Sequence, residues 1–215
     1  MIKNKKILIT GGAGFIGFHL LKKLASFNDV TILDNLRRGK KDIFFKSLIK
    51  LKNVNFINVD LTQNKKLKKK KYDFVFLLAA IVGVKNVNDQ PFDTLKVNIQ
   101  SIFNTFNFID FEKKTKLIYF STSEVYSPLV IKKKIFFPIK EEADLLFLNQ
   151  DDPRYAYYIS KILGEKLVKF FGQPFLILRP HNIYGPRMGF SHVIPEQINK
   201  IKNQSKSIVF SSSHK

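Results

Sequence analysis

Short apolar segments alternate along the chain with longer segments in which apolar residues recur at helical spacing. The short segments are almost continuously apolar, as are the strands of a parallel sheet that is covered on both faces. The sequence therefore predicts six buried strands: Lys6–Thr10, Val30–Asp34, Asn55–Val59, Phe74–Leu78, Lys116–Ser121 and Phe175–Arg179.

The longer segments predict helices, because residues such as Ile16, Leu20 and Leu24 share one helical face. Strand and helix in repeated order are typical of an α/β protein with a doubly wound parallel sheet of the Rossmann type. Residues 130–153 have no clear period and are expected to form a surface excursion. The predicted helices are Phe15–Phe27, a region around Asp42–Leu51, Asn98–Phe111 and Tyr155–Phe171.

Composition narrows the class of protein. The 215 residues are 45% hydrophobic, which is enough for a sizeable core, and the chain has no cysteine. The lack of cysteine excludes disulfides and thiolate chemistry and suits a reducing cytoplasm, where we expect the protein to act. The longest apolar run, Phe74–Val84, is about half of a membrane span, so no membrane partner is predicted. The four histidines do not have the spacing of metal ligands, so no metal is predicted. They are His19, His181, His192 and His214.

The formal net charge is +20, which raises the question of a polyanionic partner. Of the 37 basic residues, 32 are lysines, whereas nucleic-acid recognition favours the forked guanidinium of arginine. The lysines form scattered runs such as 65–66, 68–71 and 132–134. Solvated loops explain these runs, so no specific nucleic-acid partner is predicted; nonspecific polyanion binding, which moderate salt would abolish, stays open.

A glycine-rich stretch, TGGAGFIG at residues 10–17, follows the first predicted strand and begins the first helix. Gly12, Gly14 and Gly17 have the dinucleotide spacing G-x-G-x-x-G, and Gly11 adds a further glycine. Such glycines permit a tight turn and close approach of a pyrophosphate, which the helix N-terminus favours. We therefore predict a dinucleotide site built on Gly11, Gly14, Phe15, Ile16 and Gly17.

The end of the second strand supports this prediction. Asp34 stands 17 residues after Gly17, where a dinucleotide site needs an acid for the ribose hydroxyls. An acid there favours NAD over NADP, although Arg37 or Arg38 could meet a 2′-phosphate. A turn before Asn35 is the alternative role for Asp34. Asp60, which precedes Leu61, is a candidate adenine contact or a turn residue.

Tyr157 and Lys161 are candidate catalytic residues, because they lie four residues apart on one face of a predicted helix. The ammonium of Lys161, together with the positive nicotinamide ring of a bound cofactor, is expected to lower the pKa of the Tyr157 phenol and make it a base, a shift worth roughly 4 kcal/mol if it reaches neutrality. The position of the pair after the fifth strand, more than the spacing, supports this role. An exposed tyrosine beside a solvated lysine is the alternative.

Together with these residues, an ordered set of motifs resembles the NAD-dependent epimerase/dehydratase family, the extended short-chain dehydrogenases/reductases that act on nucleotide sugars. The resemblance extends from Lys6 to about Pro195. It implies that Leu78, Ala79, Ala80 and Asn98 also belong to the NAD site. The other motifs are STSEVY at 121–126 and LRPHNIYGPRMG at 178–189.

The resemblance also implies a mechanism. Thr122 would orient the sugar O4, Tyr157 would remove its proton, and Lys161 would hold the nicotinamide ribose. Hydride would pass from sugar C4 to NAD, and the 4-keto sugar would then be epimerised, dehydrated or decarboxylated. Asn182 would contact the diphosphate of a UDP-, dTDP- or GDP-sugar, and Arg187 is a further candidate substrate contact.

Ser123 and Glu124 narrow the range of reactions that the resemblance leaves open. Ser123 stands where the dTDP-glucose 4,6-dehydratases have an acid, which disfavours that reaction. The Ser123–Glu124 pair resembles UDP-glucuronate decarboxylases and GDP-mannose dehydratases, whereas the Tyr157 helix looks more like the epimerases. A capping role is the alternative for Glu124. We predict an epimerase/dehydratase, with a decarboxylase-like enzyme or a non-catalytic NAD-binding fragment as alternatives.

The resemblance also carries expectations for the domains. Residues 1–180 would form the NAD-binding domain, and residues 181–215 the beginning of a truncated substrate-binding lobe. Family members continue for about another hundred residues, so NAD binding with little turnover is expected of these residues alone. A homodimer through Asn98–Phe111 and Tyr155–Phe171 is a further expectation.

Overall fold

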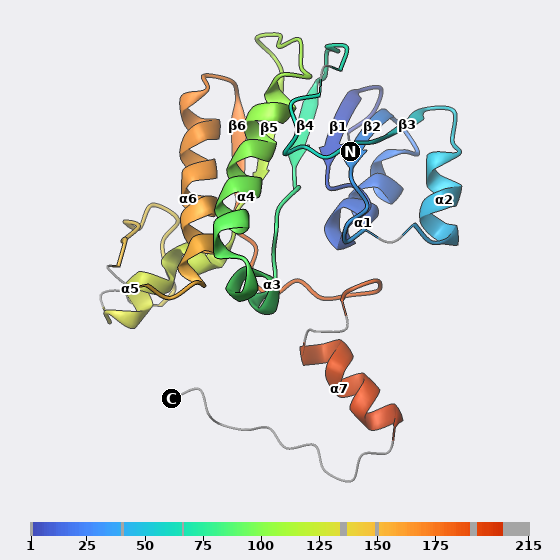
Figure 1. Ribbon diagram of the computed structural model, residues 1–215. Helices are drawn as coiled ribbons and strands as arrows, with labels where there is room; N and C mark the ends of the chain where they lie inside the picture. Colours follow the sequence, from blue (N-terminus) through green and yellow to red (C-terminus); the bar gives the residue numbers. More distant parts are fainter. Residues whose placement is uncertain are drawn as a thin grey trace. The chain divides into compact units, whose positions relative to one another are not determined.

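Six parallel strands form a single sheet in the order β3-β2-β1-β4-β5-β6 (Figure 1). Their register aligns strand starts, so that Lys6 lies beside Asp29 and Phe74 beside Lys116. One edge of the sheet, the amino edge, therefore collects the strand starts, and the opposite carboxyl edge collects the strand ends. The strands are β1 (Lys6–Thr10), β2 (Asp29–Asp34), β3 (Val54–Asn58), β4 (Phe74–Leu77), β5 (Lys116–Phe120) and β6 (Phe175–Leu178).

This computed structural model describes residues 2–39, 41–65, 67–133, 137–148, 151–189 and 193–203. The predictions that involved Lys66, Lys134, His192 and residues 204–215 lie outside the described residues.

The strand order confirms the predicted Rossmann-type α/β fold. From β1 the chain proceeds outward to β3, returns to β4 beside β1, and proceeds outward again to β6. In open sheets of this kind, ligands bind outside the carboxyl ends of the strands, at the point where the order reverses. For this sheet that point lies between β1 and β4.

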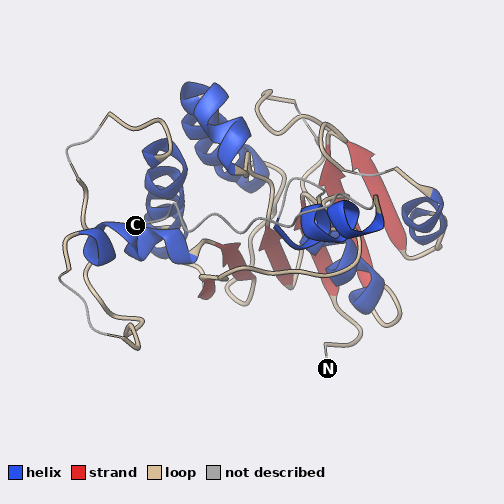
Figure 2. Ribbon diagram, turned by 90° about the horizontal axis from the view of Figure 1, so that it is seen from below, coloured by secondary structure: helices blue, strands red, loops and turns tan. Residues whose placement is uncertain are grey.

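Alternate residues of the central strands contribute to two separate cores. Ile7 and Ile9 of β1 belong to a core with residues of α1 (Phe15–Leu24) and α2 (Ile43–Ile49), whereas Leu8 belongs to a core with residues of α4 (Pro91–Phe106) and α6 (Tyr155–Phe170). Figure 2 shows helices on both faces of the sheet. Because both faces are covered, both alternating sets of residues in the central strands are buried, which explains their nearly continuous apolar character. The prediction of a buried strand is wrong for the edge strand β6, where Phe175 and Leu176 are 41% and 44% exposed.

The four predicted helices are present with different ends, and helices at Ser127–Ile131 and Val193–Lys202 were not predicted. The first helix ends at Leu24, short of the expected Phe27, and the Asn28 side-chain nitrogen donates to the Leu24 carbonyl at 2.9 Å. A helix at Val84–Asp89 was not expected, and α4 begins at Pro91, ahead of Asn98; proline suits a first helical position. The other helices are α3 (Val84–Asp89), α4 (Pro91–Phe106), α5 (Ser127–Ile131), α6 (Tyr155–Phe170) and α7 (Val193–Lys202), with a 3₁₀ turn η1 (Ser123–Tyr126).

The chain divides into two compact units, Met1–His181 and Asn182–Lys215. The first unit holds the whole sheet, and the second holds α7. The division falls within one residue of the expected domain boundary, while the role of the second unit in substrate binding stays a prediction. Of the helices in the described ranges, none has the length and apolar character that a membrane crossing requires.

Candidate functional site

The glycine-rich loop joins β1 to α1 at the carboxyl edge, and its packing requires three of the glycines. Gly11 has a φ of +71°, and a Cβ there would lie 3.0 Å from the backbone nitrogen of Ala79. A Cβ on Gly12 would lie 2.4 Å from the Ile32 side chain, and one on Gly17 would lie 2.3 Å from the Gly11 carbonyl oxygen. Gly17 therefore lets α1 approach the loop closely.

Gly14 is different, because its surroundings are open. Among the described residues, a Cβ on Gly14 would meet one atom within 4 Å, the Gly11 carbonyl oxygen at 3.2 Å. Gly14 is also the N-cap of α1, and no side chain caps this helix. The first-turn amides of Phe15 and Ile16 are thus left open beside an accessible glycine, a cradle that fits the phosphates of a dinucleotide.

The carboxylate of Asp34 ties this loop to the end of β2. One oxygen accepts a hydrogen bond from the Ala13 amide at 2.9 Å, and the other accepts one from the Leu36 amide at 2.7 Å. Burial raises the pKa of Asp34, and these two hydrogen bonds partly offset the effect. Asp34 therefore stabilises the turn at Asn35, which was the alternative role considered for it. The remaining lone pairs of its carboxylate oxygens can still accept hydrogen bonds from ribose hydroxyls.

Asp60 organises a neighbouring turn after β3. Its carboxylate accepts from the amide and the hydroxyl of Thr62, at 2.8 and 2.7 Å. Burial raises the pKa of Asp60, but hydrogen bonds from Thr62 and Asn35 and the charge of Arg37 outweigh it and lower that pKa overall. The turn role is therefore observed, the adenine contact stays a prediction, and the adjacent Leu61 is buried.

The hydroxyl of Thr10 fixes the end of β4, where Leu78, Ala79 and Ala80 follow the strand. It accepts from the amides of Leu78 and Ala79 at 3.1 and 3.2 Å. The backbone after β4 is thereby held beside the glycine-rich loop. Thr10 was not among the predicted site residues, although it begins the TGGAGFIG motif.

Asn98 holds the next part of the same segment from helix α4. Its side-chain oxygen accepts from the Ile81 amide at 2.6 Å, and its nitrogen donates to the Ser160 hydroxyl at 2.9 Å. Ser160 in turn donates to the Tyr157 carbonyl at 2.6 Å. The side-chain amide of Asn98 therefore links the segment after β4 to the Tyr157 helix, which is a positioning role, and the cofactor contact expected of Asn98 stays a prediction.

Tyr157 and Thr122 meet at the carboxyl edge, although 35 positions separate them. The Thr122 side chain acts on the Tyr157 phenol and lowers its pKa, and the Thr122 hydroxyl accepts from the Glu124 amide at 3.3 Å, which caps the η1 turn. Burial and the charge of Glu124 raise the pKa of Tyr157 to about 12, against the lowering effects of Thr122 and Arg38. This direction is opposite to the one expected from the sequence.

The reason lies in the position of Lys161. Its ammonium donates to the Phe120 carbonyl at 2.7 Å and lies 5.8 Å from the centre of the Tyr157 ring. The ammonium is thus beside the tyrosine ring and engaged by β5, and it does not lower the Tyr157 pKa as predicted. Burial lowers the pKa of Lys161 itself to about 8, while the charge of Glu165 raises it.

Arg38 crosses the same region from the loop after β2. Its guanidinium donates to the Val82 carbonyl at 2.7 Å, in the segment after β4, and its charge acts on Tyr157. From the sequence this residue was considered only for a cofactor phosphate. Its reach to the Tyr157 side of the site depends on the fold.

Glu124 and Ser123 lie on the η1 turn beside Tyr157. Glu124 forms an ion pair with Arg154, at 3.6 Å, just before α6. The Ser123 amide donates to the Pro180 carbonyl at 3.0 Å, which holds the turn against the chain after β6. Glu124 is therefore a charged neighbour of Tyr157, and the capping function in this turn belongs to Thr122.

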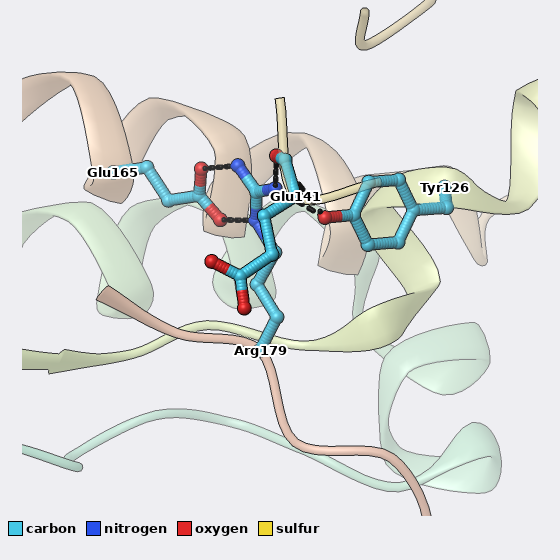
Figure 3. A network of polar contacts seen from close by, with 4 residues as sticks. All are labelled: Tyr126, Glu141, Glu165 and Arg179. Atoms are coloured by element: carbon cyan, nitrogen blue, oxygen red, sulfur yellow. Dashed lines mark hydrogen bonds and ion pairs between the residues drawn. The ribbon is translucent and has the colours of Figure 1, made fainter. Parts of the chain in front are cut away.

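Arg179 connects this turn to α6 from the end of β6. Figure 3 shows its guanidinium between Glu165 and Tyr126. It donates to both carboxylate oxygens of Glu165, at 2.9 and 2.7 Å, to the Tyr126 hydroxyl, and to the Glu141 carbonyl at 2.8 Å. The hydrogen bond to Glu165 is the main cause that raises the pKa of Arg179, which stays charged. Sequence reasoning missed this network, because its members are far apart in the chain.

Two predicted substrate contacts, Asn182 and Arg187, belong to the second unit. Asn182 is exposed and Arg187 is partly exposed with a φ of 72°. Their predicted roles stay predictions. Within the described part of the chain, His, Asp and Glu side chains form no group of three or more that could hold a metal ion.

A family model described as the NAD dependent epimerase/dehydratase family matches residues 7–214. The chain therefore belongs to this family, as its motifs predicted. The membership also confirms NAD dependence at the level of the family, and the glycine cradle and Asp34 fit such a cofactor.

Relatives with different reactions resemble the chain. UDP-N-acetyl-alpha-D-glucosaminuronate decarboxylase of Bacillus cytotoxicus is 35% identical over 204 residues, which cover 91% of this chain and 60% of the relative. The solved UDP-N-acetylglucosamine 4-epimerase of Methanobrevibacter ruminantium is 29% identical with a TM-score of 0.72, over 94% of this chain and 64% of that one. The Bordetella bronchiseptica enzyme WbmF, solved with NAD+, is 26% identical with a TM-score of 0.65, over 86% of this chain and 52% of that one. The chain thus spans less than two thirds of the length of each.

Proposed function

We propose that this protein binds NAD and oxidises C4 of a nucleotide sugar as the first step of an epimerisation or dehydration. The observation that supports this most is the position of the Thr122 hydroxyl beside the Tyr157 phenol, whose pKa it lowers, at the sheet edge that carries the glycine cradle. A hydroxyl pair of this kind can bind a sugar hydroxyl and receive its proton.

The proposed NAD site follows the sequence of elements along the carboxyl edge. The α1 amides would bind the pyrophosphate, and the acid at the end of β2 would bind the adenine-side ribose. The residues after β3 would contact the adenine, and those after β4 would contact the middle of the cofactor. Bound NAD would supply the acceptor for the hydride that leaves C4. The residues proposed are Gly11, Gly14, Phe15, Ile16, Gly17, Asp34, Asn35, Asp60, Leu61, Leu78, Ala79, Ala80, Tyr157 and Lys161, with Asn98 in a positioning role.

Within this site Tyr157 would receive the proton of the C4 hydroxyl and Thr122 would orient that hydroxyl. Proton transfer needs a tyrosine pKa close to the working pH. The groups of the chain that lower the Tyr157 pKa are the Thr122 hydroxyl and the Arg38 charge. Lys161, held by the Phe120 carbonyl beside the tyrosine ring, is placed to bind a ribose hydroxyl.

Decarboxylation is the second candidate. It is favoured by the Ser123–Glu124 turn beside Tyr157, together with the 35% identity to a decarboxylase. A uronate sugar oxidised at C4 is a β-keto acid, which can lose its C6 carboxylate as carbon dioxide. Asn182 and Arg187 are proposed as contacts to the substrate in either case, and a cytoplasmic location is proposed on the cysteine-free composition.

The test is product analysis with NAD and a panel of UDP-, dTDP- and GDP-linked sugars, by mass spectrometry and NMR. An epimer keeps the substrate mass, a dehydration removes water, and a decarboxylation removes carbon dioxide from a uronate. In a chain that carries a complete substrate-binding lobe, we expect Tyr157→Phe to lower kcat at least about a hundredfold, with NAD affinity within a few-fold of the wild type. Tyr155→Phe is the matched control on the same helix, and wild-type turnover by Tyr157→Phe would refute the mechanism.

A further inference from the structure

The amino edge of the sheet, opposite the candidate site, collects lysines from distant parts of the chain. Residues 3–6, 50–52, 68–71 and 113–116 hold twelve lysines and no acidic residue. These segments lead into β1, β3, β4 and β5, whose starts are aligned by the parallel register. Eleven of the twelve lysines are exposed and one is partly exposed. We call these four segments the basic amino edge.

Direct contacts hold three of the four segments next to their neighbours on this edge, and the register of β2 and β3 places residues 50–52 beside them. The Lys70 amide donates to the Phe108 carbonyl at 3.2 Å, and the Lys116 amide donates to the Asp73 carbonyl at 2.9 Å. The Asp73 amide in turn donates to the Lys6 carbonyl at 2.8 Å. The lysines therefore form one surface in the folded chain, although they are scattered in the sequence.

Few acidic residues oppose this charge. In the described part of the chain, the ion pairs at this edge are Lys5 with Asp73, at 3.2 Å, and Lys71 with Glu112, at 2.8 Å. The acids that adjoin the edge are Asp29, Asp73, Asp110 and Glu112, so twelve lysines against four acids leave an excess of eight positive charges.

The opposite edge has a different charge. The segment 141–152, which lies between β5 and α6, holds five acids and no lysine or arginine. Asp34, Asp60 and Glu124 add further negative charge to the carboxyl edge. Basic residues also follow the strand ends, among them Arg37, Arg38 and Lys85, so the carboxyl edge carries both charges, whereas the four segments of the amino edge carry positive charge alone.

We propose that the basic amino edge docks the protein on the surface of an anionic lipid bilayer, as a peripheral contact without a membrane span. Lysines are point charges that attract a diffuse anionic surface without a fixed geometry, and none of the five arginines lies in the four segments. Phe27, which is 44% exposed and lies under the Lys3 ammonium at the same edge, adds an apolar residue of the kind found at lipid interfaces. Docking in this way leaves the carboxyl edge facing away from the lipid.

The test is co-sedimentation of the full chain with vesicles of phosphatidylcholine that contain about 30 mol% phosphatidylglycerol, at about 50 mM salt. We expect binding to these vesicles, no binding to pure phosphatidylcholine, and release at about 0.5 M salt. The triple variant Lys68→Glu/Lys69→Glu/Lys70→Glu should bind at least about tenfold more weakly.

The matched control is Lys85→Glu/Lys132→Glu/Lys140→Glu, which changes the net charge equally with exposed lysines outside the basic amino edge. It should bind within about twofold of the wild type. Equal loss in both variants would mean that net charge alone attracts the lipid, and would overturn the proposal. Absence of binding to anionic vesicles would do the same, as would duplex DNA binding that outcompetes the vesicles. Circular dichroism of both variants separates misfolding from loss of docking.

Discussion

The buried ammonium of Lys161 makes folding stability depend on pH in a direction that can be measured. Burial lowers the pKa of Lys161 from its usual 10.5 to about 8. Between these values the unfolded chain keeps a proton that the folded chain has released, so stability should rise with pH. Wild type should gain roughly 2 to 3 kcal/mol over Lys161→Met from pH 7 to pH 10. Urea unfolding of both proteins across this range checks the prediction, and parallel stability curves would contradict it.

The glycines of the loop separate a structural role from a binding role. Gly17→Ala places a methyl group against the Gly11 carbonyl, so we expect the free energy of unfolding to fall by more than about 2 kcal/mol. Gly14→Ala meets only the Gly11 carbonyl oxygen, at 3.2 Å, and should keep the fold after a small shift, while NAD affinity falls about tenfold because the phosphates lose their close approach. Thermal unfolding and calorimetric NAD titration measure the two effects. A Gly14→Ala protein with full NAD affinity would show that the cradle does not hold the phosphates.

At the scale of elements, Arg179 joins β6, α6 and the η1 turn that carries Thr122. The Glu165 side chain is 5% exposed, so loss of Arg179 would leave a buried charge without its partner. We expect Arg179→Met to cost about 3 kcal/mol of stability, and Arg179→Met/Glu165→Met to cost less, because the second change removes that charge. Denaturant unfolding of the two variants measures both losses of stability. A double variant that is less stable than the single one would contradict the idea that the unpaired Glu165 charge causes the loss.

At the scale of the whole molecule, the outer faces of α4 and α6 support the expected homodimer. Phe92 and Phe103 lie eleven residues apart on one face of α4 and are 73% and 52% exposed; Leu163 and Phe170 lie seven apart on α6 and are 43% and 77% exposed. Such a pair of apolar faces is suited to a second copy of the chain.

We expect Phe103→Glu/Leu163→Glu to be monomeric in size-exclusion chromatography with light scattering, because charges would be buried in the interface. Ile43→Glu/Phe44→Glu on α2, at residues that are 72% and 62% exposed, is the control and should stay dimeric. A monomeric wild type, or equal dissociation of both variants, would rule out this interface.

The strands and the glycine loop could be predicted because their signals are local. Continuous apolar segments and the TGGAGFIG spacing depend on residues that are neighbours in the chain, and both were found where expected. Helix ends were less predictable, since α1 ends at Leu24 before the expected Phe27, and the residues that α4 buries near its start, Thr94 and Asn98, are polar.

By itself, the sequence determined the α/β class, the family and the identity of the candidate residues, because periodicity and motif spacing reside in consecutive residues. Only the tertiary structure decided how those residues act on one another. It brought Thr122 to Tyr157, directed the Lys161 ammonium to the Phe120 carbonyl, and gathered lysines from four segments on one edge. Burial, charge and hydrogen-bond partners depend on neighbours in space, and the parallel sheet brings together residues that lie tens of positions apart.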